Sequence, residues 1–91
     1  MGGFDWDKHN GAHLARHEVT PQEVEEVFSR PSVIEKDEPA NDEDRFLIHG
    51  TTARGRYLPV AFTERKDRIR PITAWDMTRK DRELYADEIH E

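Results

Sequence analysis

Two short links between strand-like segments do most to limit the folds open to this chain of 91 residues. Residues 45–51, 56–63 and 68–74 contain many of the β-branched and aromatic side chains that favour an extended backbone. Residues 52–55 and 64–67 join these segments, and links as short as these produce hairpins. The sequence therefore predicts an antiparallel β-meander.

The middle strand of this meander predicts which face is buried. Leu58, Val60 and Phe62 alternate with their neighbours and so share one face, which we expect to pack on helices. Pro59 and Pro71 each lack a backbone donor, which places them at a strand edge, a strand start or a bulge. The apolar positions change parity across Pro71, and this change predicts a β-bulge there.

Three helix starts can be recognised from their capping residues. Asp7 and Thr78 are suited to accept hydrogen bonds from the first turn of a following helix. Thr20 is followed by Pro21 at the first helical position and by Glu23, which completes a capping box. One helix is thus expected after each of these three caps.

The expected fold class is α+β, with a small antiparallel β-meander packed against two N-terminal helices and a C-terminal helix. All of it belongs to one domain over residues 1–91. The first helix is expected over residues 8–17 and a first short strand over 32–35. Residues 36–45 are predicted to form a flexible acidic loop, and residues 87–91 a soft tail.

Composition excludes several classes of chemistry. The chain has no cysteine, so disulfides, thiolate nucleophiles and cysteine-based zinc sites are impossible. It has no apolar run of about 20 residues and no signal-peptide pattern at its start, which favours a cytoplasmic protein without a membrane contact. A domain of this size has a thin core, so a partner or a homo-oligomer would stabilise it.

Charge is unevenly distributed along the sequence. The formal net charge is −6, which alone argues against a nucleic-acid partner. Residues 45–82, however, carry ten basic and four acidic side chains, whereas residues 1–44 carry four basic and twelve acidic ones. A concentrated positive region attracts phosphate groups even on an anionic protein. The alternative is that these arginines lie on solvated strand faces and pair with nearby carboxylates.

Three histidines in the first helix suggest a metal site at first sight. His9, His13 and His17 recur every four residues, and neighbouring histidines at this spacing can bind a divalent transition metal. No acidic ligand stands beside them in the sequence. We therefore expect neither a metal nor another cofactor, with His13 and His17 lining the inner face of the helix and His9 in solvent.

Four stretches of the sequence together resemble one known family. They are FDWD at 4–7, NGAHLARHEVTPQEVEEVF at 10–28, RFLIHGTTARGRYLPVAFTERKDRIRPI at 45–72 and IRPITAWDMTRKDRELY at 69–85. In this order they resemble the BrnT-like type II toxins, which have a RelE-like ribonuclease fold. The resemblance covers roughly residues 4–86.

The resemblance implies a ribonuclease toxin that cleaves RNA and inhibits translation. Metal-free cleavage uses the 2′-hydroxyl of the substrate as nucleophile, and a cognate antitoxin protein neutralises the toxin. The alternative is a non-catalytic binding module with the same fold, which acts with RNA or with a DNA-binding partner. In either case DNA is reached only through the antitoxin.

Candidate site residues follow from this chemistry. Planar guanidinium groups hold phosphate oxygens, while His49, Glu64 and Tyr85 are candidates for proton transfer. The resemblance points by position to Arg70, Arg79 and Tyr85. The predicted catalytic residues are Arg70, Arg79, His49, Tyr85 and Glu64, and the predicted RNA-binding residues are Arg54, Arg56, Arg65, Arg68, Lys80 and Trp75.

One departure from the family pattern favours the non-catalytic alternative. Many toxin members read Ala-Arg-x-Met-Thr at the strand-to-helix corner, whereas here Ala74 is followed by Trp75 and Asp76. The exchange of an arginine for an aromatic side chain removes a phosphate ligand, although Trp75 can stack on a base. The acidity of the whole chain points in the same direction.

Overall fold

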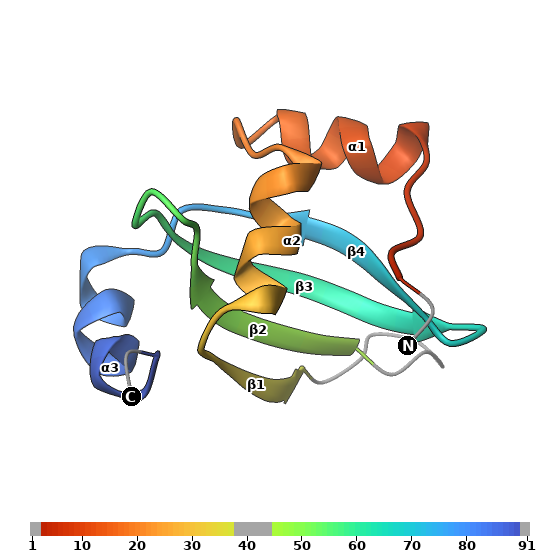
Figure 1. Cartoon of the computed structure of the whole chain (residues 1–91). Helices are drawn as coiled ribbons and strands as arrows, with labels where there is room; N and C mark the ends of the chain where they lie inside the picture. The colour runs from red at the N-terminus through yellow and green to blue at the C-terminus, as the bar shows by residue number, and fades with distance from the viewer. Residues whose placement is uncertain (1–2, 38–44, 90–91) are drawn as a thin grey trace.

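A computed structural model describes residues 3–37 and 45–89 of the chain (Figure 1). The elements follow the order α1 (Lys8–Ala15), α2 (Pro21–Ser29), β1 (Ser32–Asp37), β2 (Arg45–Thr51), β3 (Tyr57–Arg65), β4 (Arg68–Ala74) and α3 (Arg79–Ile89). The predicted α+β class is confirmed, while the likeness to the RelE fold stays a prediction. Most of the predicted acidic loop, residues 38–44, lies outside the described residues.

The sheet is an antiparallel meander in the order β1-β2-β3-β4. The predicted hairpins are confirmed, because the two short links join β2 to β3 and β3 to β4. The first strand continues to Asp37 instead of ending at residue 35, since its pairing with β2 extends as far as Arg45. At the opposite edge, Phe4 forms a parallel bridge with Ile69, so the N-terminal segment follows the outer side of β4.

The predicted bulge at Pro71 is confirmed by the strand register. Phe62 pairs with Pro71 whereas Ala61 pairs with Thr73, so Ile72 is an extra residue on β4. Proline has no backbone N–H to donate to a neighbouring strand. The irregular pairing at a bulge tolerates this missing hydrogen bond.

Helices α1 and α2 begin at the predicted caps. The carboxylate of Asp7 accepts from the backbone N–H groups of His9 and Asn10, and Thr20 and Glu23 form the predicted capping box. Helix α1 ends earlier than the histidine pattern suggests, at Ala15 and not at residue 17. The chain turns there because Glu18 takes a left-handed conformation with φ of 57°.

This turn has the hydrogen bonds of a Schellman motif. The N–H of Val19 donates to the carbonyl of Leu14, and the N–H of Glu18 donates to that of Ala15. The motif places Val19 in the core and His17 in solvent. The prediction that His17 lines the inner face was therefore wrong, whereas His9 is exposed as expected.

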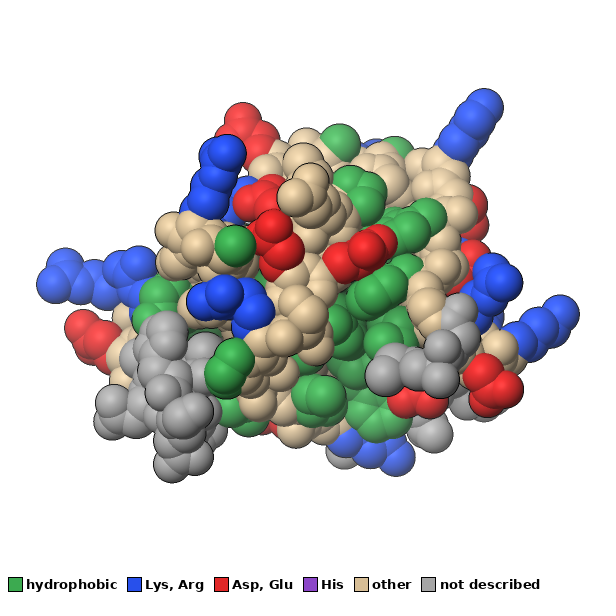
Figure 2. Space-filling view, in the orientation of Figure 1, with side chains coloured by type: hydrophobic (Ala, Val, Ile, Leu, Met, Phe, Trp, Pro, Cys, Tyr) green, Lys and Arg blue, Asp and Glu red, His purple; other side chains and the backbone are tan. Residues whose placement is uncertain are grey.

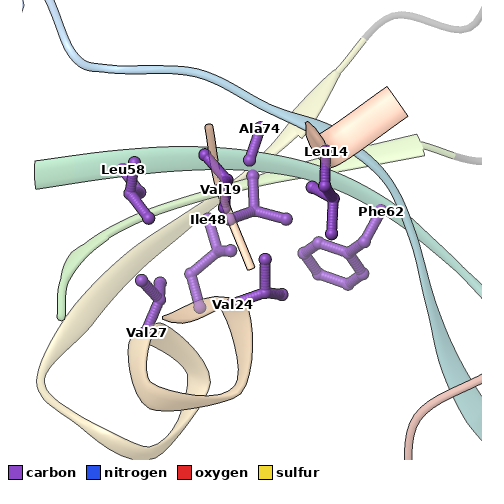
Figure 3. Packing of buried hydrophobic residues seen from close by; sticks show 9 residues of the cluster. Leu14, Val19, Val24, Val27, Ile48, Leu58, Phe62 and Ala74 are labelled. Carbon is purple, nitrogen blue, oxygen red and sulfur yellow. The ribbon is translucent and has the colours of Figure 1, made fainter. Parts of the chain in front are cut away.

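The hydrophobic core lies between α1, α2 and one face of the sheet (Figure 3). The predicted face of β3 supplies Leu58, Val60 and Phe62, which pack with Leu14 and side chains of α2. Gly50 of β2 permits α2 to lie close to the sheet, because a Cβ at this position would lie only 2.9 Å from Cγ1 of Val27. Helix α2 thus lies across one face of the sheet, and α1 lies along the β4 edge (Figure 1).

Helix α3 packs against β1 and β2 at one end of the sheet. Its capping by Thr78 is confirmed, since the Thr78 hydroxyl accepts from the N–H of Asp81 at 3.1 Å. The helix starts at Arg79, after an extended segment in which the N–H of Met77 donates to the carbonyl of Tyr57. It continues to Ile89 and so includes part of the predicted soft tail, whereas residues 90 and 91 lie outside the described residues.

Arg56 joins the α1–α2 turn to the start of β3. Its guanidinium donates to the carbonyls of His17 and Glu18, at 3.1 and 2.8 Å. It also forms ion pairs with Glu23, at 3.2 Å, and with Asp76, at 2.7 Å. The hydrogen bond from Arg56 is the main cause that lowers the pKa of Asp76 below its ordinary value. Arg56 therefore has a structural role, in which it connects the α1–α2 turn to the start of β3.

An Arg56→Gln variant is expected to unfold with a free energy about 1–2 kcal/mol lower than that of the parent at neutral pH. The stabilisation from Asp76 is present above its unfolded pKa and is lost as pH falls through its lowered folded pKa. The stability difference between parent and variant should therefore shrink in acid. Urea denaturation from pH 7 to pH 2 measures this, with Arg54→Gln on the neighbouring exposed turn as control. A difference that stays constant over this range would contradict the assignment.

Candidate active site

The face of the sheet opposite α2 carries the candidate site. Residues of β2 alternate, so Ile48 lies in the core on the α2 side and His49 points to the other side. On this second face Val33 pairs with His49, and Glu35 pairs with Leu47. Helix α3 approaches the same face from the C-terminal part of the chain.

His49, Glu35 and Tyr85 form a cluster on this face. Nε2 of His49 lies 3.1 Å from Oε1 of Glu35. The Tyr85 hydroxyl donates to the same oxygen at 3.4 Å. The rings of His49 and Tyr85 are stacked, with centroids 4.2 Å apart and planes 8° from parallel. Three elements that are distant in sequence therefore bring a carboxylate, an imidazole and a phenol together.

Burial differs within this cluster. The His49 side chain is 8% exposed and lies beneath Tyr85, whereas the Glu35 side chain is 45% exposed. An ionised carboxylate only accepts hydrogen bonds, so His49 must carry a proton on Nε2 to bond to Glu35. Its other nitrogen, Nδ1, is buried and has no hydrogen-bond partner among the described residues. His49 is thus placed to orient Glu35, and Glu35 is the member that a substrate can reach.

Arg82 adds a cation beside the cluster. Its guanidinium carbon lies 5.6 Å from the ring centroid of Tyr57, which shares the sheet face of His49. Arg82 and Tyr85 are three residues apart on α3, and side chains at this spacing lie on one helix face. Arg82 therefore brings a guanidinium to the same side of the sheet as the cluster.

The other predicted catalytic residues lie elsewhere. Glu64 is exposed on the α2 side of the sheet, in the wall of an apolar hollow, so the structure does not bring it to His49. Arg70 forms ion pairs with Asp5 and Asp7, at 3.4 and 2.9 Å. The hydrogen bond with Asp7 is the main cause that raises the pKa of Arg70. Arg79 is 87% exposed at the start of α3, 3.8 Å from Glu83.

The predicted RNA-binding residues are spread over the surface. Arg54 and Arg68 are exposed in the walls of two hollows on the α2 side, and Lys80 is exposed on α3. Arg65 is exposed at the end of β3 and lines a third hollow. Trp75 is partly exposed, and its backbone N–H donates to the carbonyl of Pro59. Arg56 is engaged in the interactions that join the α1–α2 turn to β3.

The largest of these hollows is apolar and lies beside α2 (Figure 2). It has a volume of about 520 Å³, and Phe4, Phe28 and Ile34 contribute to its walls. Ile34 is 57% exposed, which is unusual for so large an apolar side chain. Since this hollow opens on the face opposite His49, it takes no part in the acid–base cluster.

The three histidines of the first helix do not converge. The rings of His9 and His13 meet edge to face with centroids 4.9 Å apart, while His17 lies in the turn after the helix. Among the side chains that the structure describes, in residues 3–37 and 45–85, no group of three or more from His, Asp and Glu is arranged to hold a metal ion.

Sequence reasoning missed Glu35 and Arg82. Arg82 could have been found, because it precedes Tyr85 by one helical turn. Glu35 could not be connected to His49, because the link from β1 to β2 is too long for its length to fix the register of the two strands.

The fold and the cluster define a small α+β protein with acid–base groups and a cation on one sheet face, a combination suited to phosphodiester cleavage. The family model described as "Ribonuclease toxin, BrnT, of type II toxin-antitoxin system" matches residues 6–81. The chain therefore belongs to the BrnT toxin family, and this classification implies a cognate antitoxin as partner.

No match was found among curated proteins. None of the helices in the described part of the chain has the length and apolar composition needed to cross a membrane.

Proposed function

We propose that this protein cleaves RNA without a metal ion at the cluster of Glu35, His49 and Tyr85. The observation that carries the proposal is the shared hydrogen bonding of His49 and Tyr85 to one carboxylate oxygen of Glu35. Membership of a ribonuclease toxin family supports RNA as the substrate. Cytoplasmic action, where translation takes place, is part of the same proposal.

Glu35 acts as the general base in the proposed mechanism. Its carboxylate removes the proton of a ribose 2′-hydroxyl, and the 2′-oxygen forms a bond to the adjacent phosphorus. The bond from phosphorus to the 5′-oxygen then breaks. The Tyr85 hydroxyl gives its proton to this leaving oxygen and regains one from Glu35 through their hydrogen bond. The products are a 2′,3′-cyclic phosphate and a 5′-hydroxyl.

The remaining residues of the cluster position groups and stabilise charge. His49 is a positioning residue, because it is buried and reaches the substrate only through Glu35 and the Tyr85 ring. Arg82, whose guanidinium lies over the Tyr57 ring, is proposed to stabilise the additional negative charge on the phosphate in the transition state. Arg70 is held by two carboxylates and is assigned no direct role in the chemistry.

The cognate antitoxin is proposed to neutralise the enzyme by covering the sheet face that bears Glu35 and Tyr85. Cleavage of messenger RNA would then inhibit translation only while the antitoxin is absent. The alternative function is a non-catalytic module that binds RNA or a DNA-binding partner. The exchange at Trp75 and Asp76 favours this alternative, and intact RNA in a cleavage assay would support it.

A Tyr85→Phe variant tests the proposed function. The phenylalanine ring keeps the stacking on His49 but has no proton to donate, so we expect RNA cleavage to slow about 10²-fold. Purified protein, free of antitoxin, is incubated with end-labelled RNA in EDTA, and the product ends are identified by mass. The parent should leave 2′,3′-cyclic phosphate and 5′-hydroxyl ends.

Two results would overturn this proposal. RNA that stays intact with the parent, but is retarded on a gel, would show binding without catalysis. Cleavage that EDTA abolishes would show that a metal is required. Tyr57→Phe is the matched control, since Tyr57 lies on the same sheet face and its hydroxyl has no assigned role in proton transfer.

A further inference from the structure

The apolar hollow beside α2 takes no part in the proposed chemistry, and contacts between its own side chains hold its walls in place (Figure 2). The ring of Phe28 meets those of Phe4 and Phe62 edge to face, with centroids 5.3 and 5.0 Å apart. Because these contacts fix the wall before a partner arrives, binding there requires little ordering of the protein. The large apolar side chains of the lining are Phe4, Phe28, Ile34, Ile48, Phe62 and Ile69.

The hollow has room for several side chains of a partner. Its volume is about 520 Å³. A cavity of about 150 Å³ takes one molecule of the size of benzene, so this hollow can hold roughly three large apolar side chains. Ile34 in its wall is 57% exposed, so a partner that fills the hollow removes apolar surface from water.

Acidic side chains contribute to the same lining. Its described residues include three carboxylates, from Glu25, Glu64 and Asp67, but one guanidinium, from Arg68. The indole of Trp6 donates to Glu25 at 2.8 Å, and because the indole is neutral the carboxylate keeps its charge. Such a lining repels the phosphates of RNA and the same surface of a second copy, whereas it attracts lysine and arginine. The hollow therefore suits a peptide segment that has apolar side chains with basic ones beside them.

Strand β1 connects this hollow to the proposed catalytic face. It is the first strand in the order β1-β2-β3-β4 and so forms an edge of the sheet. Ile34 lies in the wall of the hollow, whereas the next residue, Glu35, lies on the opposite face beside His49. Consecutive Cα atoms are about 3.8 Å apart, so a segment that passes round this edge can contact both Ile34 and Glu35.

We propose that the cognate antitoxin binds in this hollow through such a segment and passes round the β1 edge to cover Glu35. The inference rests on the proposed function for the role of Glu35, whereas binding in the hollow requires no catalysis. Affinity comes from the apolar walls and the acidic lining. Inhibition comes from the part of the antitoxin that lies over Glu35.

Calorimetric titration with the purified cognate antitoxin tests this binding site independently of RNA. Ile34→Thr removes apolar surface from the hollow but keeps the β-branched shape that suits a strand. Its Kd for the antitoxin should rise about tenfold. Leu84→Gln is the matched control, because Leu84 is another large apolar side chain, 66% exposed, and glutamine preserves helix propensity. Its Kd should change little.

Asp67→Asn tests the acidic lining. Asparagine has the same shape and tolerates the left-handed backbone at this position, where φ is 66°. The Kd of this variant should rise about threefold at about 50 mM salt and little at about 500 mM, because salt screens exposed charges. Glu18→Gln is the control, since Glu18 is an exposed acidic residue in the α1–α2 turn.

Equal affinities of the parent, Ile34→Thr and Asp67→Asn for the antitoxin would overturn the inference, even if the antitoxin inhibits RNA cleavage. A loss of affinity in Leu84→Gln without one in Ile34→Thr would place the antitoxin on α3 instead. Sedimentation of the parent alone tests for a second copy, since a dimer that Ile34→Thr dissociates would also overturn the inference. If the parent does not cleave RNA but Ile34→Thr weakens antitoxin binding, the binding site stands and the ribonuclease proposal fails.

Discussion

A Glu35→Gln variant is expected to cleave RNA about 10²- to 10⁴-fold more slowly than the parent, the range typical of losing a general base. The amide keeps the shape of the side chain, and its oxygen can still accept from His49 and Tyr85. It cannot take up the proton of the 2′-hydroxyl. Single-turnover rates with saturating protein measure the chemical step, and RNA affinity should change little.

Glu64→Gln is the matched control for this experiment. Glu64 is also an exposed carboxylate on a strand, but it lies on the α2 side of the sheet. The sequence alone made Glu64 a candidate for proton transfer, whereas the structure favours Glu35. If Glu64→Gln slows cleavage and Glu35→Gln does not, the site must be sought on the other face.

Local features of the fold could be predicted because each depends on residues that are close in sequence. The capping box of Thr20 and Glu23 needs only one helical turn. The β2–β3 and β3–β4 hairpins need only short links, and the bulge at Pro71 follows from the chemistry of proline. These elements already fix most of the sheet and the face on which α2 packs.

The candidate site could be predicted only in part, because it depends on contacts between distant segments. His49 and Tyr85 were recognised by their chemistry, but nothing in the sequence required their rings to stack. Glu35 was missed because its register against β2 is set by pairing and not by a short turn. His49 and Tyr85 could therefore be predicted from residue type, whereas Glu35 could be recognised only in the tertiary structure.

Arg56 and Arg70 were predicted from their chemical suitability alone, and their carboxylate partners became visible only in the fold. Both have the guanidinium that phosphate binding requires, and both lie in the basic part of the sequence. In the fold, Arg56 forms ion pairs with Glu23 and Asp76, and Arg70 forms ion pairs with Asp5 and Asp7. Their carboxylate partners come from other elements, so a count of charge along the chain could not identify these pairs.

Asn10 holds α1 against the sheet through its buried side chain, which is 2% exposed. Its amide nitrogen donates to the carbonyls of Asp5 and Pro71, at 2.8 and 3.1 Å. Its amide oxygen accepts from the N–H of Asp7, which completes the capping box of α1. One side chain thus connects the N-terminal segment, the helix start and the bulge of β4.

An Asn10→Asp variant is expected to lower the free energy of unfolding by about 2–4 kcal/mol, because two buried carbonyls lose their donor and face a carboxyl group. In a domain of this size, such a loss lowers the Tm by about 10–20 °C. Thermal unfolding followed by circular dichroism measures it. Gly11→Ala, the adjacent position of α1, is the control, because a Cβ there would meet no atom within 4 Å. Alanine should raise stability by about 0.5–1 kcal/mol. If Asn10→Asp melts with the parent, the amide bonds do not hold α1 to β4, and the ion pairs of Arg70 with Asp5 and Asp7 must fix the start of α1 instead.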